Sequence, residues 1–503
     1  MTMLSVLMTT EGTYPYGAGG VSTWCDALLR NTPDVCYTLL PVMMNPHIEA
    51  KFDPPSNVRK IIAVPLWGIE EPGEFAVGVP FAELYKRKGR TAGARIENEF
   101  IPLLTRFLAS VNSGGADPAA LGRLLVEMED YFRRRDYNET MKSRPVWEAF
   151  VETMQANSRR MAPTLPPTAR VHQAPTLFDL TESLRWLYRF LIVLNARVPA
   201  VSVTHTTAAA FCGIPCIIAK ARDGTPMIVT EHGVYLREQN LFLSRFRRLF
   251  FCKQFLLNLI TAVVRANYHH ADVVAPVCHY NTRWELVHGT LPHKIRVIYN
   301  GVDPELFTPP PPGSQTRLHP PHVVATMRID PLKDIETFLR VAARVCERRP
   351  EVRFTIFGAV ADEAYYQRCL ALRRELRLDD VVTMGQATAD VVSAYRDADV
   401  VLLTSVSEAF PYSVIEAMAC ERAVVASDVG GVGEALEECG ILVKPRDVDG
   451  FAAAVGQLLD DPALRARLAR RARLLVLDNF RLDGSVAAYL DLYRGLAGSR
   501  VAA

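Results

Sequence analysis

Short apolar runs rich in β-branched residues recur along this chain of 503 residues, and segments with helical periodicity separate them. A strand buried on both faces of a parallel sheet reads as a continuous apolar run rather than as an alternating one. Strands that alternate with helices form parallel sheets covered by helices. The pattern predicts the α/β class, with strands at residues 4–8, 60–64, 201–204, 227–230, 272–276 and 295–299 and then at 323–326, 353–357, 381–384, 400–404, 423–427 and 441–443.

A proline-rich stretch at residues 309–321 separates these two groups of runs. Proline fixes its own φ and lacks the amide donor, so the stretch can continue neither a helix nor a central strand. A chain of 503 residues also exceeds what one ordinary core can organise. We therefore expect one Rossmann-like domain at residues 1–308, a linker at 309–321, a second such domain at 322–485 and a C-terminal helix within 486–503. A charged, largely helical stretch at about 81–175 interrupts the first domain.

Bulk composition argues against some partners and compartments. The formal net charge is only +2, so no broad basic field indicates nucleic acid as a partner. None of the ten cysteines forms a CxxC pair, and the N-terminus lacks a basic region followed by a cleavage site. We expect a cytoplasmic protein without a disulfide framework.

One apolar segment, residues 249–264, leaves a membrane contact open. It is too short and too polar to span a bilayer, but Arg245, Arg247 and Arg248 precede it. It fits either an interfacial helix at the inner face of a membrane or an amphipathic helix that covers a sheet. We favour the second interpretation.

A glycine-rich loop follows the first predicted strand. Gly17, Gly19 and Gly20 tolerate positive φ and let a ligand approach the backbone, and a helix begins directly after them. A helix N-terminus of this kind binds anions through its free N–H groups. The spacing does not match GxGxxG, so a dinucleotide fingerprint is not supported, and a tight strand–helix turn explains the loop equally well.

Two glutamates follow the predicted strand at 400–404. Glu408 lies in the loop at the carboxyl end of that strand, where open α/β sheets bind ligands, and Glu416 lies in the helix that follows. Carboxylates here can accept hydrogen bonds from sugar and ribose hydroxyls. For Glu416 a second interpretation stays open, because Ser413-x-x-Glu416 matches a capping box that serves only its own helix.

Two cations, Arg328 and Lys333, follow the first strand of the second domain. Fixed cations at this position can neutralise a departing diphosphate, whereas an isolated Arg–Lys pair elsewhere is usually solvated surface.

In the first domain, His205, Glu231 and His232 lie at predicted strand ends. Each can contact a ligand, or can merely pack and orient its loop. Asp447-Val-Asp449 has the form of a DxD metal motif, but it lies in a charged turn without a second cluster, so we expect no metal site.

Taken in order, the segments GTYPYGAGGVSTW, EHGVY, IYNGVDPELF and RIDPLKD and the Glu408-x7-Glu416 motif resemble the GT-B glycosyltransferases of family 4, especially the PelF-like group. The resemblance covers most of the chain and is weakest between residues 81 and 175. It implies two facing Rossmann-like domains with a deep cleft, retention of anomeric configuration and no need for a metal or cofactor.

The resemblance also implies roles for individual residues. Arg328 and Lys333 hold the donor diphosphate, Glu416 binds the ribose, Glu408 contacts the donor sugar, and His205 contacts the transferred sugar. The remaining donor-binding candidates are Gly19, Gly20, Phe410, Pro411, Tyr412 and Ser413, and the acceptor-side candidates are Glu231 and His232.

The implied reaction is transfer of a sugar from a nucleotide sugar, UDP-glucose or a related UDP-sugar, to a glycan or other hydroxyl acceptor in exopolysaccharide synthesis. Two alternatives stay open: a non-catalytic GT-B subunit of a polysaccharide assembly, and another GT-B reaction such as sugar-nucleotide epimerisation. Ala409 departs from the family, which commonly has glycine there, and alanine would cost roughly 1 kcal/mol if that position needed positive φ.

Overall fold

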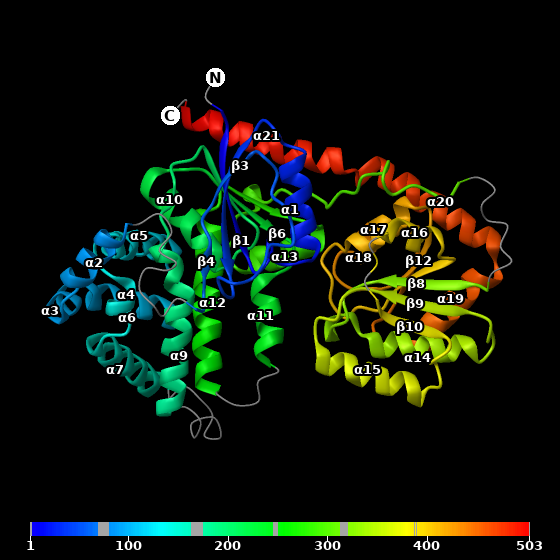
Figure 1. Cartoon of the computed structure of the whole chain (residues 1–503), viewed down its shortest axis with the longest axis horizontal. Helices are drawn as coiled ribbons and strands as arrows, with labels where there is room; N and C mark the ends of the chain where they lie inside the picture. Colours follow the sequence, from blue (N-terminus) through cyan, green and yellow to red (C-terminus); the bar gives the residue numbers. More distant parts are fainter. Residues whose placement is uncertain are drawn as a thin grey trace. The chain divides into compact units, whose positions relative to one another are not determined.

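The computed structural model describes residues 3–68, 80–161, 175–244, 250–311, 320–386, 388 and 390–501. Two compact units divide the chain: one combines Met1–Pro276, Thr282–Arg296 and Leu490–Ala503, and the other combines Val277–Asn281 with Val297–Tyr489. Each unit holds a parallel sheet with helices on its faces, which confirms the α/β class (Figure 1). Most of the expected linker, residues 312–319, lies outside the described residues, and the second unit already includes residues 297–308.

The first unit is built on a sheet with seven strands among the described residues, in the order β3-β2-β1-β5-β6-β7, with β4 beside β2. The order reverses between β1 and β5, which makes this the topological switch point of the sheet. The strands are β1 (Ser5–Glu11), β2 (Cys36–Met43), β3 (Val58–Ile61), β4 (Val64–Pro65), β5 (Val203–Thr206), β6 (Met227–Glu231) and β7 (Val273–Pro276).

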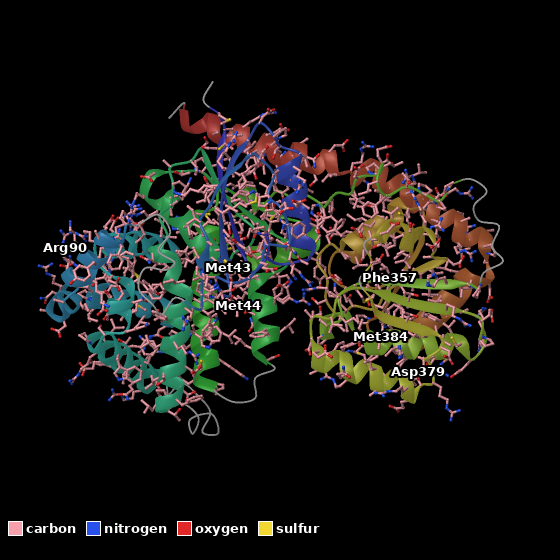
Figure 2. All side chains as sticks on the ribbon, in the orientation of Figure 1. Met43, Met44, Arg90, Phe357, Asp379 and Met384 are labelled. Atoms are coloured by element: carbon pink, nitrogen blue, oxygen red, sulfur yellow. The ribbon has the colours of Figure 1, made fainter. Side chains whose placement is uncertain are left out.

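One strand prediction for this unit was wrong, and one strand of the sheet was not predicted. Residues 295–299 form no named strand, and only an isolated bridge joins Ile295 to Val274. In contrast β2 lies inside the sheet, with Met43 at its carboxyl end (Figure 2), although Pro41 interrupts its sequence. A proline ordinarily argues against a central strand because it donates no ladder hydrogen bond.

The helical insertion of the first unit packs against α10 (Ile214–Asp223) and α12 (Phe250–His270), as Figure 1 shows for α5 and α12. Asp117, Asp136 and Thr176 cap three of its helices, because each side chain accepts a backbone N–H in the first turn. Its elements are α2 (Phe81–Arg90), α3 (Gly93–Arg95), η1 (Ile96–Phe100), α4 (Ile101–Asn112), α5 (Pro118–Arg134), α6 (Tyr137–Met141), α7 (Arg144–Met161) and α9 (Leu177–Phe190).

The segment considered for membrane contact belongs to α12, whose buried residues include Phe255, Leu259 and Val263. These side chains pack into the core of the first unit, so the interpretation as a helix that covers the fold is confirmed over the described part of the segment. Among the described residues, no helix combines the length and the apolar character that crossing a membrane requires. The remaining elements are α1 (Gly20–Arg30), η3 (Leu191–Asn195), η4 (Phe211–Gly213), α11 (Tyr235–Ser244), α13 (His279–Val287) and η5 (Pro292–Lys294).

The second unit contains a parallel sheet in the order β10-β9-β8-β11-β12-β13, so its switch point lies between β8 and β11. All six predicted strand runs form strands here, and Phe357 and Met384 lie on the neighbouring strands β9 and β10 (Figure 2). The strands are β8 (His322–Thr326), β9 (Arg353–Phe357), β10 (Val382–Gln386), β11 (Val400–Leu403), β12 (Ala423–Ser427) and β13 (Ile441–Val443).

The helices of the second unit cover this sheet and enclose one apolar core. The last helix, α21 (Leu482–Val501), counts with the second unit up to Tyr489 and with the first unit from Leu490 onward. The others are η6 (Pro331–Lys333), α14 (Ile335–Cys346), α15 (Glu363–Glu375), α16 (Val391–Arg396), α17 (Tyr412–Ala419), α18 (Val432–Leu436), α19 (Val448–Asp460) and α20 (Pro462–Asn479).

A buried pair of carboxyl groups, Glu231 and Glu285, lies in the first unit beside Tyr268. Both Glu285 oxygens and Oε2 of Glu231 have no hydrogen-bond partner among the described residues. Burial, reinforced by the charge of Glu231, raises the pKa of Glu285 to about 9, and burial raises the pKa of Glu231 to about 8. The folded protein therefore keeps protons here that the unfolded chain releases near pH 4.5.

Because the folded state binds more protons than the unfolded state above pH 4.5, this pair should make stability fall as the pH rises toward 9. Glu285→Gln removes the titration and keeps the shape. Differential scanning calorimetry should find the variant more stable than wild type at pH 8 by at least ~2 °C in Tm, with the difference vanishing near pH 5. Glu97→Gln, at an exposed position, is the control and should change neither value. A constant Tm difference across this pH range would contradict the prediction.

Candidate functional site

The switch point of the second sheet brings two predicted site residues together. Lys333 ends η6, after β8, and Glu408 lies in the loop after β11, the strand next to β8. The Lys333 ammonium forms an ion pair with the Glu408 carboxylate, and the two side chains are 18% and 10% exposed. Backbone bonds fix the two loops, since Val406 N–H donates to Leu332 and the Thr404 hydroxyl donates to the Lys333 carbonyl. A mostly buried ion pair thus lies where an open α/β sheet binds ligands.

Arg328 lies on the same β8 loop but faces solvent. Its guanidinium is 55% exposed and stands 3.6 Å from the Asp330 carboxylate. The loop is packed closely against the end of β9, because a Cβ on Gly358 would lie 1.9 Å from the Met327 carbonyl oxygen. The backbone of the loop at Met327 and Arg328 is therefore fixed by its contact with Gly358, while the exposed guanidinium of Arg328 can turn toward an anion.

The loop that carries Glu408 rests on a pair of glycines that the sequence analysis missed. A Cβ on Gly430 would lie 1.7 Å from the Glu408 carbonyl oxygen, and Gly431 N–H donates to the Ala409 carbonyl at 2.7 Å. Gly430 has a φ of 58°, a conformation that glycine adopts without strain. Ala409 is not among the residues with positive φ, so its methyl group carries no such backbone penalty.

Glu416 lies on α17 and accepts a hydrogen bond from the Tyr395 hydroxyl at 2.9 Å. Tyr395 also bonds to Thr326 at the end of β8, so Glu416 is tied to the same edge of the sheet. The N-cap of α17 is Pro411, and no side chain caps it, so the capping-box interpretation of Ser413 and Glu416 is wrong. Burial raises the pKa of Glu416 to about 7.

The residues between the two glutamates divide into packed and accessible positions. Phe410 is buried against the Tyr299 ring at 4.9 Å, and its carbonyl accepts from the Asn300 amide. Pro411 is buried as well, whereas Tyr412 and Ser413 are half-buried at the start of α17. From this segment a ligand can therefore meet the half-buried side chains of Ala409, Tyr412 and Ser413 and the N-terminus of α17.

In the first unit the glycine-rich loop ends at the N-terminus of α1. Gly19 is the N-cap of this helix with a φ of 150°, no side chain caps it, and Gly20 is the first helical residue. Gly12 and Gly19 are the loop residues with positive φ, whereas Gly17 is not among them, and a Cβ on Gly17 would lie 2.5 Å from the Gly12 carbonyl oxygen. The first turn of α1 therefore has no side-chain cap, which is the condition that the predicted anion site requires.

His205 is fully buried in β5, and both ring nitrogens are engaged. Nδ1 bonds to the Tyr493 hydroxyl and Nε2 to the Thr230 hydroxyl, each at 2.7 Å. Burial lowers the pKa of His205 to about 3, so the ring is neutral near pH 7. A neutral imidazole with two hydroxyl partners is saturated and offers no nitrogen to a sugar hydroxyl in this arrangement.

His232 differs from His205 in this respect. Its Nε2 is buried and has no hydrogen-bond partner among the described residues. The ring packs edge-on against Trp24, with 4.6 Å between the ring centroids, and burial lowers the pKa to about 3. Of the two predicted histidines, His232 is therefore the one with a ring nitrogen that has no protein partner among the described residues. Its position in the sequence had indicated only an acceptor-side role.

Glu231, the residue before His232, supports its own loop. It is completely buried, and Oε1 accepts from the Ala209 N–H at 2.8 Å. Glu11 acts similarly at the end of β1, because its carboxylate accepts from the Tyr235 hydroxyl and from the Cys212 N–H. Both carboxyl groups orient the loops at this edge of the sheet.

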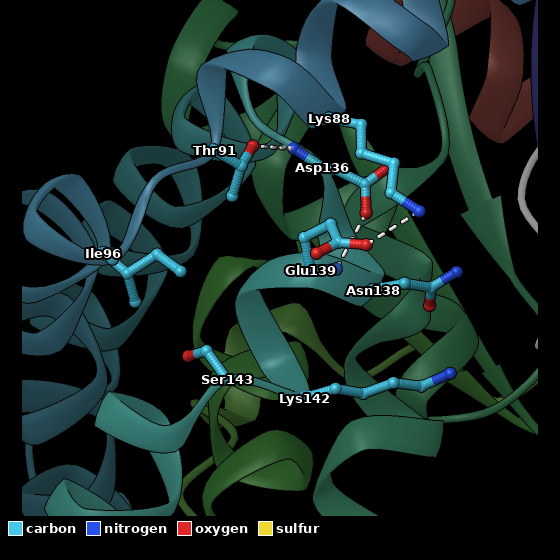
Figure 3. A pocket seen from close by; sticks show the side chains of 9 residues that line it. Lys88, Thr91, Ile96, Asp136, Asn138, Glu139, Lys142 and Ser143 are labelled. Atoms are coloured by element: carbon cyan, nitrogen blue, oxygen red, sulfur yellow. Dashed lines mark hydrogen bonds and ion pairs between the residues drawn. The ribbon is translucent and has the colours of Figure 1, made fainter.

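A surface pocket of about 320 Å³ lies in the helical insertion, and Figure 3 shows its lining. Its polar groups already have local partners: Lys88 pairs with Glu139 at 2.9 Å, and the Thr91 hydroxyl accepts from the Asp136 N–H. The Asn138 side chain accepts from the Tyr188 hydroxyl. These bonds join α2, α6 and α9, so we interpret the pocket as a junction between helices rather than as a ligand site.

No group of three His, Cys, Asp or Glu side chains able to hold a metal occurs in the part of the chain that the structure describes. The DxD-like pair serves the structure, because Asp447 caps α19 and Asp449 pairs with Arg344 at 2.9 Å.

Comparison with known proteins agrees with this geometry. Residues 313–475 match the family described as glycosyl transferases group 1, so the second unit carries a glycosyltransferase domain. Residues 4–293 match the family described as Domain of unknown function (DUF3492), and the chain belongs to that family.

Curated relatives match over part of their length. The chain is 34% identical to the D-inositol 3-phosphate glycosyltransferase of Kineococcus radiotolerans over 250 residues, which is 44% of this chain and 56% of that protein. It is 32% identical to the enzyme of the same name from Rhodococcus erythropolis over 224 residues, 42% of this chain and 50% of that protein. The chain thus spans about half the length of these relatives.

Solved structures show the GT-B fold over nearly the whole chain. Sucrose-phosphate synthase from Thermosynechococcus elongatus aligns with a TM-score of 0.60 and 19% identity, covering 99% of this chain and 100% of the other. Anabaena HepE, solved with UDP and glucose, aligns with a TM-score of 0.57 and 14% identity, covering 97% and 99%. The predicted fold of two Rossmann-like domains is confirmed.

Glu416 provides a pH test of the ribose-binding role. A carboxylate accepts hydrogen bonds from two ribose hydroxyls better than its protonated form does, and the Glu416 pKa is raised to about 7. We expect UDP affinity measured by calorimetry to rise ~3–10-fold from pH 6 to pH 8 in wild type. Glu416→Gln should bind more weakly and lose this pH dependence. An identical pH profile in the variant, with only its Tm lowered, would make Glu416 a structural residue.

Proposed function

We propose that the protein is a retaining glycosyltransferase that moves a sugar from a UDP-sugar, UDP-glucose or a close relative, to a hydroxyl acceptor. The observation that carries the proposal is the Lys333–Glu408 pair at the switch point of a glycosyltransferase domain, with Arg328 and Glu416 at the same sheet edge. UDP is supported by the fold shared with HepE, whose structure holds UDP and glucose. PelF-like specificity and a role in exopolysaccharide synthesis rest on the sequence motifs.

The chemistry follows from how charge changes along the reaction. Cleavage of the bond between sugar and phosphate leaves additional negative charge on the diphosphate. Lys333 and Arg328 stabilise that charge more strongly in the transition state than in the bound donor, which lowers the barrier. Lys333 turns from Glu408 to the phosphate when the donor binds, and Glu408 is then free to accept hydrogen bonds from the donor sugar.

Two groups of the first unit complete the proposal. The uncapped N-terminus of α1 supplies N–H groups to phosphate oxygens, and His232 supplies its free Nε2 to a hydroxyl of the transferred sugar. The leaving diphosphate oxygen takes the acceptor proton on the same face, which gives retention without a covalent intermediate. Ala409 does not adopt positive φ, so this departure from the family pattern gives no support to the alternative of a non-catalytic subunit.

Nucleotide binding should not require a metal, because cations and helix N-termini fulfil its role in this site. Calorimetry with UDP in excess chelator should give the same affinity, within about twofold, as in the presence of magnesium or manganese. Loss of binding on chelation, restored by manganese, would contradict the metal-free site. Absence of binding under every condition would contradict the proposed function itself.

Lys333→Ala should lower kcat by roughly 30- to 1000-fold, since a charge-assisted contact to the leaving group contributes about 2–4 kcal/mol in a dry site. The variant also leaves Glu408 mostly buried without its partner, so Tm should fall. Lys333→Arg should restore only part of the rate, because a planar fork does not reproduce a point charge.

The matched control is Lys88→Ala, which removes a half-exposed lysine from an ion pair in the helical insertion. Steady-state kinetics should find it indistinguishable from wild type. Wild-type kcat in folded Lys333→Ala would remove Lys333 from the mechanism.

A further inference from the structure

A chain of buried polar groups connects the C-terminal helix to the sheet of the first unit. Tyr493 on α21 is completely buried, and its hydroxyl bonds to Nδ1 of His205. Nε2 of His205 bonds to the hydroxyl of Thr230. A neutral imidazole needs one donor and one acceptor, and the two hydroxyls can supply either, so the chain is fully satisfied. Removal of any member takes a hydrogen bond away from a buried polar neighbour, which is unfavourable.

The Thr230 end of this hydrogen-bonded series lies close in sequence to His232. Thr230 is in β6, two residues before His232, so its side chain helps to fix where the backbone leaves the strand. Trp24 contacts both imidazoles edge-on, at 5.5 Å from His205 and 4.6 Å from His232 between ring centroids. The backbone and the indole ring are therefore two physical connections between His205 and His232.

Tyr493 is itself held by the body of the first unit. Its ring lies 6.4 Å from that of Tyr37, whose hydroxyl bonds to Thr32 at 2.8 Å. The residues of α21 from Leu490 onward count with this unit, so a hydroxyl from the end of the chain completes a network among residues hundreds of positions earlier. If position 493 only had to cover the sheet with an apolar ring, phenylalanine would pack there as well as tyrosine does.

We propose that Tyr493 is a positioning residue for the reaction, acting through His205 and Thr230 to set the orientation of His232. The inference rests on the proposed function for its kinetic consequence but not for its structural one. Tyr493 fixes the ring position of His205, His205 fixes the Thr230 hydroxyl and packs against Trp24, and these contacts hold Nε2 of His232 where it has no protein partner among the described residues.

The experiment compares Tyr493→Phe with Tyr131→Phe in the full chain. The control removes another buried tyrosine hydroxyl of the first unit, which bonds to Thr140 at 3.1 Å and lies in the helical insertion. With UDP-glucose as donor, Tyr493→Phe should lower kcat about tenfold, while the donor KM and the calorimetric affinity for UDP stay within about twofold. The control should keep wild-type kcat even if its Tm falls by a similar amount.

Nitrogen-15 spectra of imidazole-labelled protein give a readout that needs no activity. Ring nitrogen shifts of both His205 and His232 should change in Tyr493→Phe and should stay unchanged in Tyr131→Phe. Thr230→Val, which breaks the chain on the other side of His205, should reproduce the kinetic and spectral changes. The double variant should be no worse than either single one, because both break the same connection. Thr230→Val also tests the proposal if Tyr493→Phe does not fold.

Two outcomes would overturn the proposal: unchanged His232 shifts in both variants, or kcat that falls only in proportion to the folded fraction. If wild type neither binds UDP nor uses UDP-sugars, the proposed function fails. The spectra then still decide whether Tyr493 controls His232.

Discussion

The ion pair between Lys333 and Glu408 depends on a constraint that organises the whole second unit. Parallel strands place all their carboxyl ends at one edge, and the reversal of strand order between β8 and β11 leaves their loops side by side there. A lysine from one loop and a glutamate from the other then meet in a mostly buried position. Gly358 and Gly430 belong to this constraint, because any side chain at either position would push one of the two loops away.

Burial divides the charged and titratable groups of the protein into two kinds. Glu11 and Glu231 accept backbone N–H or tyrosine hydroxyl groups and hold loops at strand ends. Lys333 and Glu408 neutralise each other, an arrangement that an incoming anion can replace. A buried pair is poor as a source of stability, because desolvation offsets most of its Coulomb energy, and this suits a pair that has to open for a ligand.

Strand-end position in the sequence was enough to predict where several candidate site residues lie in the fold. Arg328, Lys333, Glu408 and Glu416 were selected because they follow apolar runs, and the structure does place them at one sheet edge. The pattern of those runs also predicted the fold class, and it failed at β2, where Pro41 interrupts a real strand, and at residues 295–299, where an apolar run has only one bridge. Whether such a run becomes a strand depends on the neighbouring strand with which it pairs, and that strand is distant in the sequence.

The histidines illustrate what local sequence does not contain. His205 and His232 both follow or end strands, and nothing nearby indicates which one is saturated. The answer depends on Tyr493, 288 residues after His205, and on Thr230.

The most direct measurement of the central claim is the anomeric form of the first product, read by proton NMR before mutarotation, when the protein is given UDP-glucose and water or a hydroxyl acceptor. The account predicts the α-anomer, the configuration of the donor. An initial β-anomer, or no release of sugar from any UDP-sugar, would contradict it.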